Sequence, residues 1–235
     1  MNATLVAHCG TTKVDRAFLD QIGTPEATDT FQPISHKILV DAVEESLAFR
    51  HISIERSEFA VSQDGMKMFG LLEVNQVHEG VQFAVGLRNA NDKSMRLGMV
   101  AGYRVFVCDN MSLSGDFNPL LAKHTKHLDL IESVSMGIDR IQRNWSPLRA
   151  EIDRKRSTVL DPEQARLLIY KAFAHHKLPV SLFNKVAKTY ELDESSEGNT
   201  LWELEQCFTG AFKALKPIAQ FQAASKLSKA LLLPA

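Results

Sequence analysis

The hydrophobic pattern of this chain changes its period once, and that change limits the fold more than any other feature of the sequence. Over residues 52–108 short apolar segments are separated by turn signals at Asp64-Gly65 and Glu79-Gly80. Strands joined by such short connections pair into an antiparallel sheet. After Pro119 apolar residues recur every three or four positions, which indicates helices. We therefore expect an α+β fold in which an N-terminal helix and an antiparallel meander sheet precede a helical C-terminal half.

Capping residues place the helices. Ser35 precedes an amphipathic stretch, so we expect a helix over 35–50, and a weaker helical pattern covers 13–22. Asp161 followed by Pro162 is typical of a helix start. The remaining helices are expected over 120–145, 180–192, 200–215 and the segment after Pro217.

The length of the chain allows one large domain or two small ones, because 235 residues can bury a sizeable core. We place an α+β sheet domain at 1–118 and a helical region at 119–235, which packs on the sheet. One continuous domain is the alternative.

Composition and cysteine usage favour a cytoplasmic protein. The chain is 45% apolar and 23% charged, with a net charge of -1, so it has no overall basic field of the kind that marks many nucleic-acid binders. Cys9, Cys108 and Cys207 are far apart and odd in number, which fits free thiols rather than disulfides. No signal-peptide pattern and no run of roughly 18 to 20 apolar residues is present, so we expect no membrane association.

Cations concentrate in the middle of this nearly neutral chain. Residues 86–104 hold four basic side chains against one acid, Asp92, and residues 123–127 and 140–156 are also rich in lysine and arginine. Such a surface can follow a polyanion backbone, because lysine and arginine release counterions from phosphates. The predicted nucleic-acid-binding residues are Arg88, Lys93, Arg96, Arg104, Lys123 and Lys126. The alternative is a solvated helix face with local ion pairs.

Other site chemistries find less support. The glycine spacing of the phosphate-binding P-loop and of the dinucleotide fingerprint is missing, and so is the G-x-S-x-G elbow of a nucleophilic serine. His124 and His127 would face the same side of the expected helix, but two ligands do not make a metal site. We therefore predict no catalytic residues, no cofactor and no metal site.

The segments "VGLRNANDKS", "AGYRVFVCDNMSLSG", "KHT" and "NTLWELEQCFTGAFK" together resemble the phage/plasmid-like proteins of domain-of-unknown-function family 932. The resemblance covers about residues 30–215 and implies a setting in mobile genetic elements, where nucleic-acid transactions are common. The positions that it marks are Arg88, Asn89, Asp92, Lys93, Ser94, Gly102, Phe106, Cys108, Asp109, Asn110, His124, Thr125, Trp202 and Thr209.

A strand over 93–102 would put the polar turn over 88–94 at one end of the sheet, where it could meet Asp109 and Asn110. We favour this arrangement, although these residues can also be simple turn formers. The leading hypothesis is a non-enzymatic protein that binds nucleic acid, single-stranded DNA in particular. An enzyme or small-ligand binder that uses Asp92, Asp109, Asn110 and His124 around a metal ion or polar ligand is the first alternative. The second is a structural protein that forms homo-oligomers through its C-terminal helices.

Overall fold

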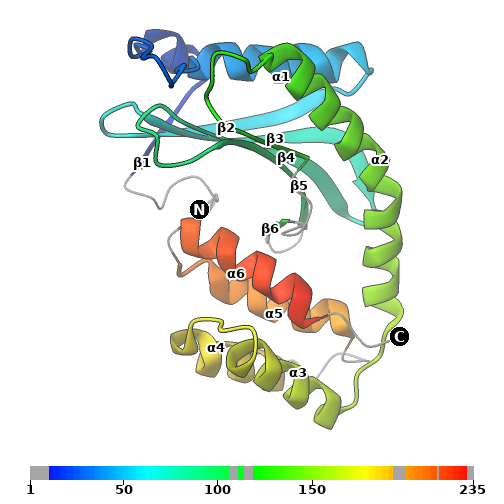
Figure 1. Ribbon diagram of the computed structural model, residues 1–235. Helices are drawn as coiled ribbons and strands as arrows, with labels where there is room; N and C mark the ends of the chain where they lie inside the picture. The colour runs from blue at the N-terminus through cyan, green and yellow to red at the C-terminus, as the bar shows by residue number, and fades with distance from the viewer. Residues whose placement is uncertain (1–10, 106–110, 114–118, 193–199, 216, 232–235) are drawn as a thin grey trace.

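The computed structural model describes residues 11–105, 111–113, 119–192, 200–215 and 217–231. The early helix α1 (His36–Phe49) is followed by an antiparallel sheet and by a C-terminal half that is mostly helical, so the predicted α+β fold is confirmed. Figure 1 shows α1 and the beginning of the long helix α2 (Leu130–Ser157) over one face of the sheet, and the later helices on the other side.

The described strands form one sheet of seven. Six of them lie side by side in chain order as an antiparallel meander, and β7 pairs with one end of β5. Both predicted turns are confirmed: Gly65, Glu79 and Gly80 have φ values of 70°, 49° and 71°, a region that glycine enters without steric cost. The strands are β1 (Thr11–Val14), β2 (Ile54–Ser62), β3 (Lys67–His78), β4 (Val81–Ala90), β5 (Leu97–Val105), β6 (Met111–Leu113) and β7 (Leu120–Ala122).

The face of the sheet beneath α1 carries the main hydrophobic core. Phe59, Gly70, Leu87 and Met99 stand opposite one another on four neighbouring strands, and so they share this face. Position 70 leaves little room for a side chain, because a Cβ there would lie 3.1 Å from two carbons of the Phe59 ring. The helices complete the core with Leu39, Val43 and Leu47 from α1 and with Val134, Ile138 and Ile141 from α2.

The C-terminal helices surround a second core, which includes Phe208 and Phe212. These helices are α3 (Pro162–Ala174), the 3₁₀ turn η2 (Val180–Leu182), α4 (Phe183–Leu192), α5 (Leu201–Phe212) and α6 (Pro217–Ala230). Asp161 caps α3 as predicted, and Thr200 caps α5 in the same way, since each side chain accepts a hydrogen bond from the backbone three residues later.

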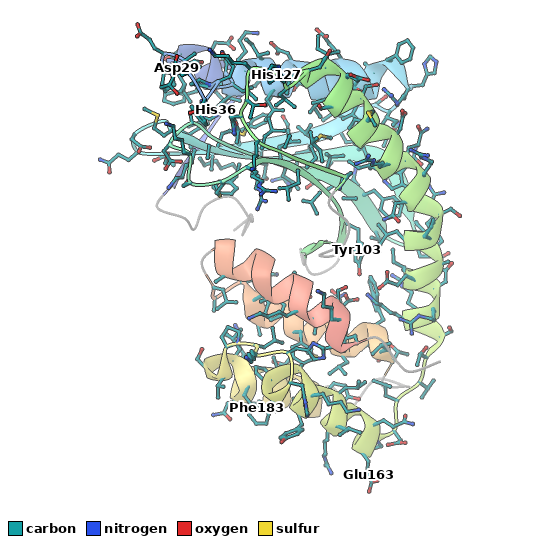
Figure 2. The ribbon with its side chains drawn as sticks, in the orientation of Figure 1. Asp29, His36, Tyr103, His127, Glu163 and Phe183 are labelled. Carbon is teal, nitrogen blue, oxygen red and sulfur yellow. The ribbon has the colours of Figure 1, made fainter. Side chains whose placement is uncertain are left out.

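A buried ion pair joins the helical half to the sheet. Lys155 of α2 donates to Glu205 of α5 at 2.9 Å, and the hydroxyl of Tyr103 on β5 donates to the other carboxylate oxygen at 3.1 Å. Trp202 stacks on Tyr103 at 5.8 Å between ring centroids. In Figure 2 Tyr103 lies between the sheet and the helices, whereas Glu163 and Phe183 mark the helices farthest from the sheet. Burial alone would lower the pKa of Lys155, but Glu205 and other nearby groups raise it, so the ammonium stays charged.

Two predicted helices differ from the structure. The segment 13–22 contains the end of β1 and only a short 3₁₀ turn, η1 (Ala17–Gln21). The helix expected over 120–145 is wrong over 120–129, because Leu120–Ala122 pairs with β5 and the helix begins only after Asp129. Asp129 fixes that start by accepting a hydrogen bond from the Glu132 amide at 2.9 Å. Ser35 is the N-cap of α1 as predicted, although its hydroxyl makes no capping bond.

Within the described ranges, no helix combines the length and the apolar character that a membrane crossing requires.

Candidate functional site

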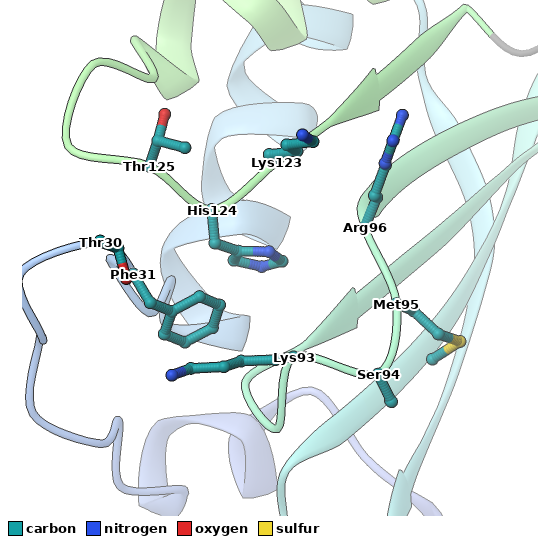
Figure 3. Close-up of a pocket in the computed structure, with 9 residues that line it drawn as sticks. All are labelled: Thr30, Phe31, Lys93, Ser94, Met95, Arg96, Lys123, His124 and Thr125. Carbon is teal, nitrogen blue, oxygen red and sulfur yellow. The ribbon is translucent and has the colours of Figure 1, made fainter.

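A pocket of about 440 Å³ lies where three separate segments meet beside the sheet (Figure 3). The connection between β4 and β5 contributes Lys93, Ser94, Met95 and Arg96. The segment between β7 and α2 contributes residues 123–125, and the segment before α1 contributes residues 30–31. The site is therefore built from parts of the chain that are far apart in the sequence.

The lining of this pocket is basic. Lys93, Arg96 and Lys123 are all exposed, and none of the described residues that line the pocket carries a carboxylate. In Figure 3 the side chain of Lys93 extends on one side of His124, and those of Arg96 and Lys123 extend on the other. Three hydroxyl side chains, Thr30, Ser94 and Thr125, also belong to the lining. Cations and hydroxyls in one concave surface are suited to phosphate groups.

Lys93 is held in an unusual backbone conformation. Its φ is 66°, in the left-handed region that residues other than glycine, asparagine and aspartate rarely adopt. Its ammonium lies 5.1 Å from the centroid of the Phe31 ring, a cation–π contact that orients the side chain along the pocket. Asp92 shapes the same turn by accepting hydrogen bonds from the Ser94 amide at 3.0 Å and the Ser94 hydroxyl at 2.5 Å.

Both oxygens of the Asp92 carboxylate have partners within the protein. Its second oxygen pairs with Lys67 at 3.0 Å. Partial burial opposes ionisation of Asp92, but the hydrogen bonds from Ser94 and the Lys67 ammonium outweigh it and lower the pKa of the carboxyl. Asp92 therefore stays an anion that holds the turn.

Behind the pocket lies a buried chain of polar side chains. Asn89 of β4 accepts a hydrogen bond from His124 Nε2 at 2.7 Å, and its amide nitrogen bonds to His36 Nδ1 at 2.9 Å and to the Ile34 carbonyl at 2.7 Å. His36 Nε2 bonds in turn to the Gly65 carbonyl at 2.9 Å. All three side chains are 5% exposed or less. This network fixes the segment before α1 and the segment after β7 against the sheet.

Both histidines of this network are neutral at pH 7. Burial lowers the pKa of His36, which the bond to the Gly65 carbonyl opposes only in part. Burial also lowers the pKa of His124, and the neighbouring His36 lowers it further. The ring of His124 packs at 5.3 Å from that of Phe31, and its backbone carbonyl accepts a hydrogen bond from the Gln32 amide at 3.1 Å.

The structure divides the six predicted nucleic-acid-binding residues. Lys93, Arg96 and Lys123 share the pocket, whereas Lys126 is exposed but does not line it. Arg88 is half-buried on the opposite face of the sheet from Asn89, with its side chain packed across Gly98. Burial lowers the pKa of Arg88. The side chain of Arg104 lies outside the described residues.

Six of the fourteen positions that the resemblance marks, Lys93 among them, line the pocket or support it. Ser94, His124 and Thr125 line it, Asp92 shapes its turn, and Asn89 lies behind it. Asp109 and Asn110 fall outside the described residues, so their expected meeting with the turn stays a prediction. The segments 93–102 and 103–105 belong largely to one strand, β5, rather than to two.

Three arginines of α2 make contacts with the sheet and its connections. Arg149 donates to Gln76 at 2.9 Å, Arg140 donates to the Pro119 carbonyl at 3.0 Å, and Arg156 donates to the Glu79 carbonyl at 2.7 Å. Arg156 also lies 4.8 Å from the centroid of the Trp202 ring. These contacts hold α2 on the sheet, so three of its arginines are engaged within the protein.

Metal-binding geometry is not found in the described part of the chain, where no three His, Cys, Asp or Glu side chains form a candidate cluster. The expectation that His124 and His127 face one side of a helix is wrong, because both residues precede α2. His124 is buried and bonded to Asn89, and His127 is exposed.

Sequence reasoning missed the residues that complete the site. Phe31 and Thr30 stand in a segment that reads as a linker, and His36 reads as an ordinary first residue of a helix. The two asparagines of "NAN" could have indicated this contact from the sequence. Asn89 and Asn91 both donate to the Ile34 carbonyl, at 2.7 Å and 3.0 Å.

Comparisons with known proteins found no match: no family model, no curated protein and no solved structure is significantly similar to this chain.

Proposed function

We propose that this protein binds nucleic acid, and single-stranded DNA in particular, through the pocket formed by Lys93, Arg96 and Lys123. The observation that carries the proposal is the convergence of these three exposed cations, from two distant segments, on a concave surface lined by no carboxylate among its described residues. Phosphates bind such surfaces by displacing condensed counterions.

The shape of the pocket favours a single strand over a duplex. The cations extend on two sides of the His124 ring (Figure 3), so successive phosphates of a flexible strand can each find a positive partner. A duplex presents its phosphates on a wide, stiff cylinder, which fits a flat basic surface or a groove-reading helix better than a small pocket. The backbone strain at Lys93 also supports a binding role, because strained residues cluster at functional sites.

Fluorescence anisotropy with a labelled oligo-dT strand tests the proposal. Affinity should fall steeply as salt rises, because each phosphate contact contributes about 0.7 to the slope of log K against log salt for single strands. The triple variant Lys93→Ala, Arg96→Ala, Lys123→Ala should bind more weakly, with a slope smaller by about 2.

A matched control removes the same charge elsewhere. Lys171, Lys185 and Lys188 are exposed on α3 and α4 and do not line the pocket. Their triple alanine variant should keep the affinity and the salt dependence of the unmodified protein. If both triple variants lose the same affinity, the effect comes from net charge and not from the pocket. Absence of binding at low salt would contradict the proposed function itself.

A further inference from the structure

The buried hydrogen bonds determine where each proton of the polar network lies. The Ile34 and Gly65 carbonyls can only accept, so the nitrogen of the Asn89 amide faces Ile34 and Nε2 of His36 carries a proton. Asn89 Oδ1 must then accept from His124, which places the proton of His124 on Nε2. Since His124 is neutral, its Nδ1 keeps a lone pair.

This lone pair is unused within the protein as described. His124 is 5% exposed and lines the pocket, and the described residues provide no hydrogen bond to its Nδ1. Nδ1 is not sealed in the interior, so water or a ligand in the pocket can reach this acceptor. The cations of the pocket are donors and attract anions, whereas Nδ1 of His124 requires an N–H or O–H group.

A ligand that satisfies the whole pocket must carry both anions and a donor. Inside a DNA strand the phosphodiester and the deoxyribose have no N–H or O–H group, so the donor has to come from a base edge. A pocket of about 440 Å³ falls within the range of about 300–1,000 Å³ that is usual for small-molecule sites, and so it has room for a base.

We propose that the pocket takes up one unstacked nucleobase, whose N–H group donates to His124 Nδ1 while the flanking phosphates pair with Lys93 on one side and with Arg96 and Lys123 on the other. This inference rests on the proposed binding of single-stranded DNA and adds a base contact to it. Proteins read extruded bases in this way, through hydrogen bonds to the edge of the base within a pocket.

A strand that lacks only the donor tests the base contact. Thymine within a strand has one N–H group, at N3, and N3-methylthymine lacks it while it keeps the ring and the phosphates. The protein should bind an N3-methyl oligo-dT strand about five- to tenfold more weakly than oligo-dT, as expected for the loss of one hydrogen bond. Equal binding of both strands would overturn the base contact and leave the salt-dependent backbone binding intact. Absence of binding to either strand at low salt would instead reject the proposed function.

A variant separates the hydrogen bond from a clash with the added methyl group. His124→Gln can place an amide N–H near the position of Nε2 and so retain the bond to Asn89, but it offers no acceptor at Nδ1. This variant should bind oligo-dT and the N3-methyl strand equally well. If it still prefers oligo-dT, the added methyl group clashes with the pocket and the inference is overturned. If the variant does not fold, NMR of the unmodified protein with ¹⁵N-labelled histidine tests the contact instead. The Nδ1 resonance of His124 should shift when oligo-dT binds and should not shift with the methylated strand. A resonance that does not shift with oligo-dT rejects the contact.

Discussion

The Oδ1 atom of Asn89 and the Nε2 atom of His124 are 2.7 Å apart, in a place where the two side chains are 0% and 5% exposed. This one hydrogen bond connects β4 to the segment that leads into α2, across 35 positions of the sequence. It therefore links the two segments that carry the cations of the pocket, and it makes the support of the site part of the buried interior.

Replacing Asn89 by alanine should strongly destabilise the protein. The change leaves His36 Nδ1 and His124 Nε2 without their partner, whereas the Ile34 carbonyl keeps its bond from Asn91. Each unsatisfied buried group costs about 1–3 kcal/mol. We expect a loss of about 3 kcal/mol or more in the free energy of unfolding, measured by urea denaturation. Asn75→Ala is the control, since Asn75 is exposed and makes one bond to the Ser53 amide. A similar small loss in both variants would refute the role of the network.

Stability should decrease as the pH falls below about 6.5, the ordinary pKa of histidine. The pKa values of His36 and His124 are lowered in the folded protein, so between the folded and unfolded values the unfolded chain binds more protons. Their contribution to stability is thus complete above pH 6.5 or so and is lost as the pH falls toward the folded values. Urea unfolding at several pH values measures this slope. His36→Gln, which retains no titrating group at that position, should show a shallower slope, and an unchanged slope would speak against this assignment.

Lys93→Gly should separate binding from stability. Glycine relieves the left-handed backbone at this position, which contributes up to about 1 kcal/mol, and loss of the contact with Phe31 offsets about 0.5 kcal/mol of it. The melting temperature should therefore stay the same or rise, while affinity for oligo-dT falls. Lys177 is the matched control, since it is also an exposed lysine with a positive φ, 53°, but it does not line the pocket. Lys177→Gly should stabilise the protein to a similar degree and leave binding unchanged. A loss of binding in both variants would mean that Lys93 is not specific to the site.

The buried pair of Lys155 and Glu205 offers a test of how the two halves are joined. Lys155→Met alone leaves the Glu205 carboxylate buried without its lysine, which should cost roughly 3–5 kcal/mol. The double variant Lys155→Met, Glu205→Leu removes both charges and should recover most of that loss, although the Tyr103 hydroxyl then loses its acceptor. Denaturation of the single and double variants gives the coupling. Additive losses would show that the pair does not act as a unit.

The sequence alone determined the coarse order of the fold, an early helix, a meander sheet and then a helical half, because the signals involved are local. Alternating apolar residues, the glycines at the two hairpin turns and the cap at Asp161 act over a few residues each, and all three predictions are confirmed. The sequence also singled out Lys93, Arg96 and Lys123, since an excess of cations over acids is visible in the residues themselves.

Only the tertiary structure decided which of these residues form a site. Leu120–Ala122 has a helical pattern but pairs with β5, because a vacant stretch of that strand offers backbone hydrogen bonds that outweigh local preference. This pairing brings Lys123 and His124 to the β4–β5 turn. The partners of Asn89 lie 53 and 35 positions away in the sequence, so no local pattern can announce them. Arg88 and Asn89 are adjacent in the sequence yet face opposite sides of the sheet, because side chains alternate along a strand. That alternation puts one of them behind the pocket and excludes the other from it.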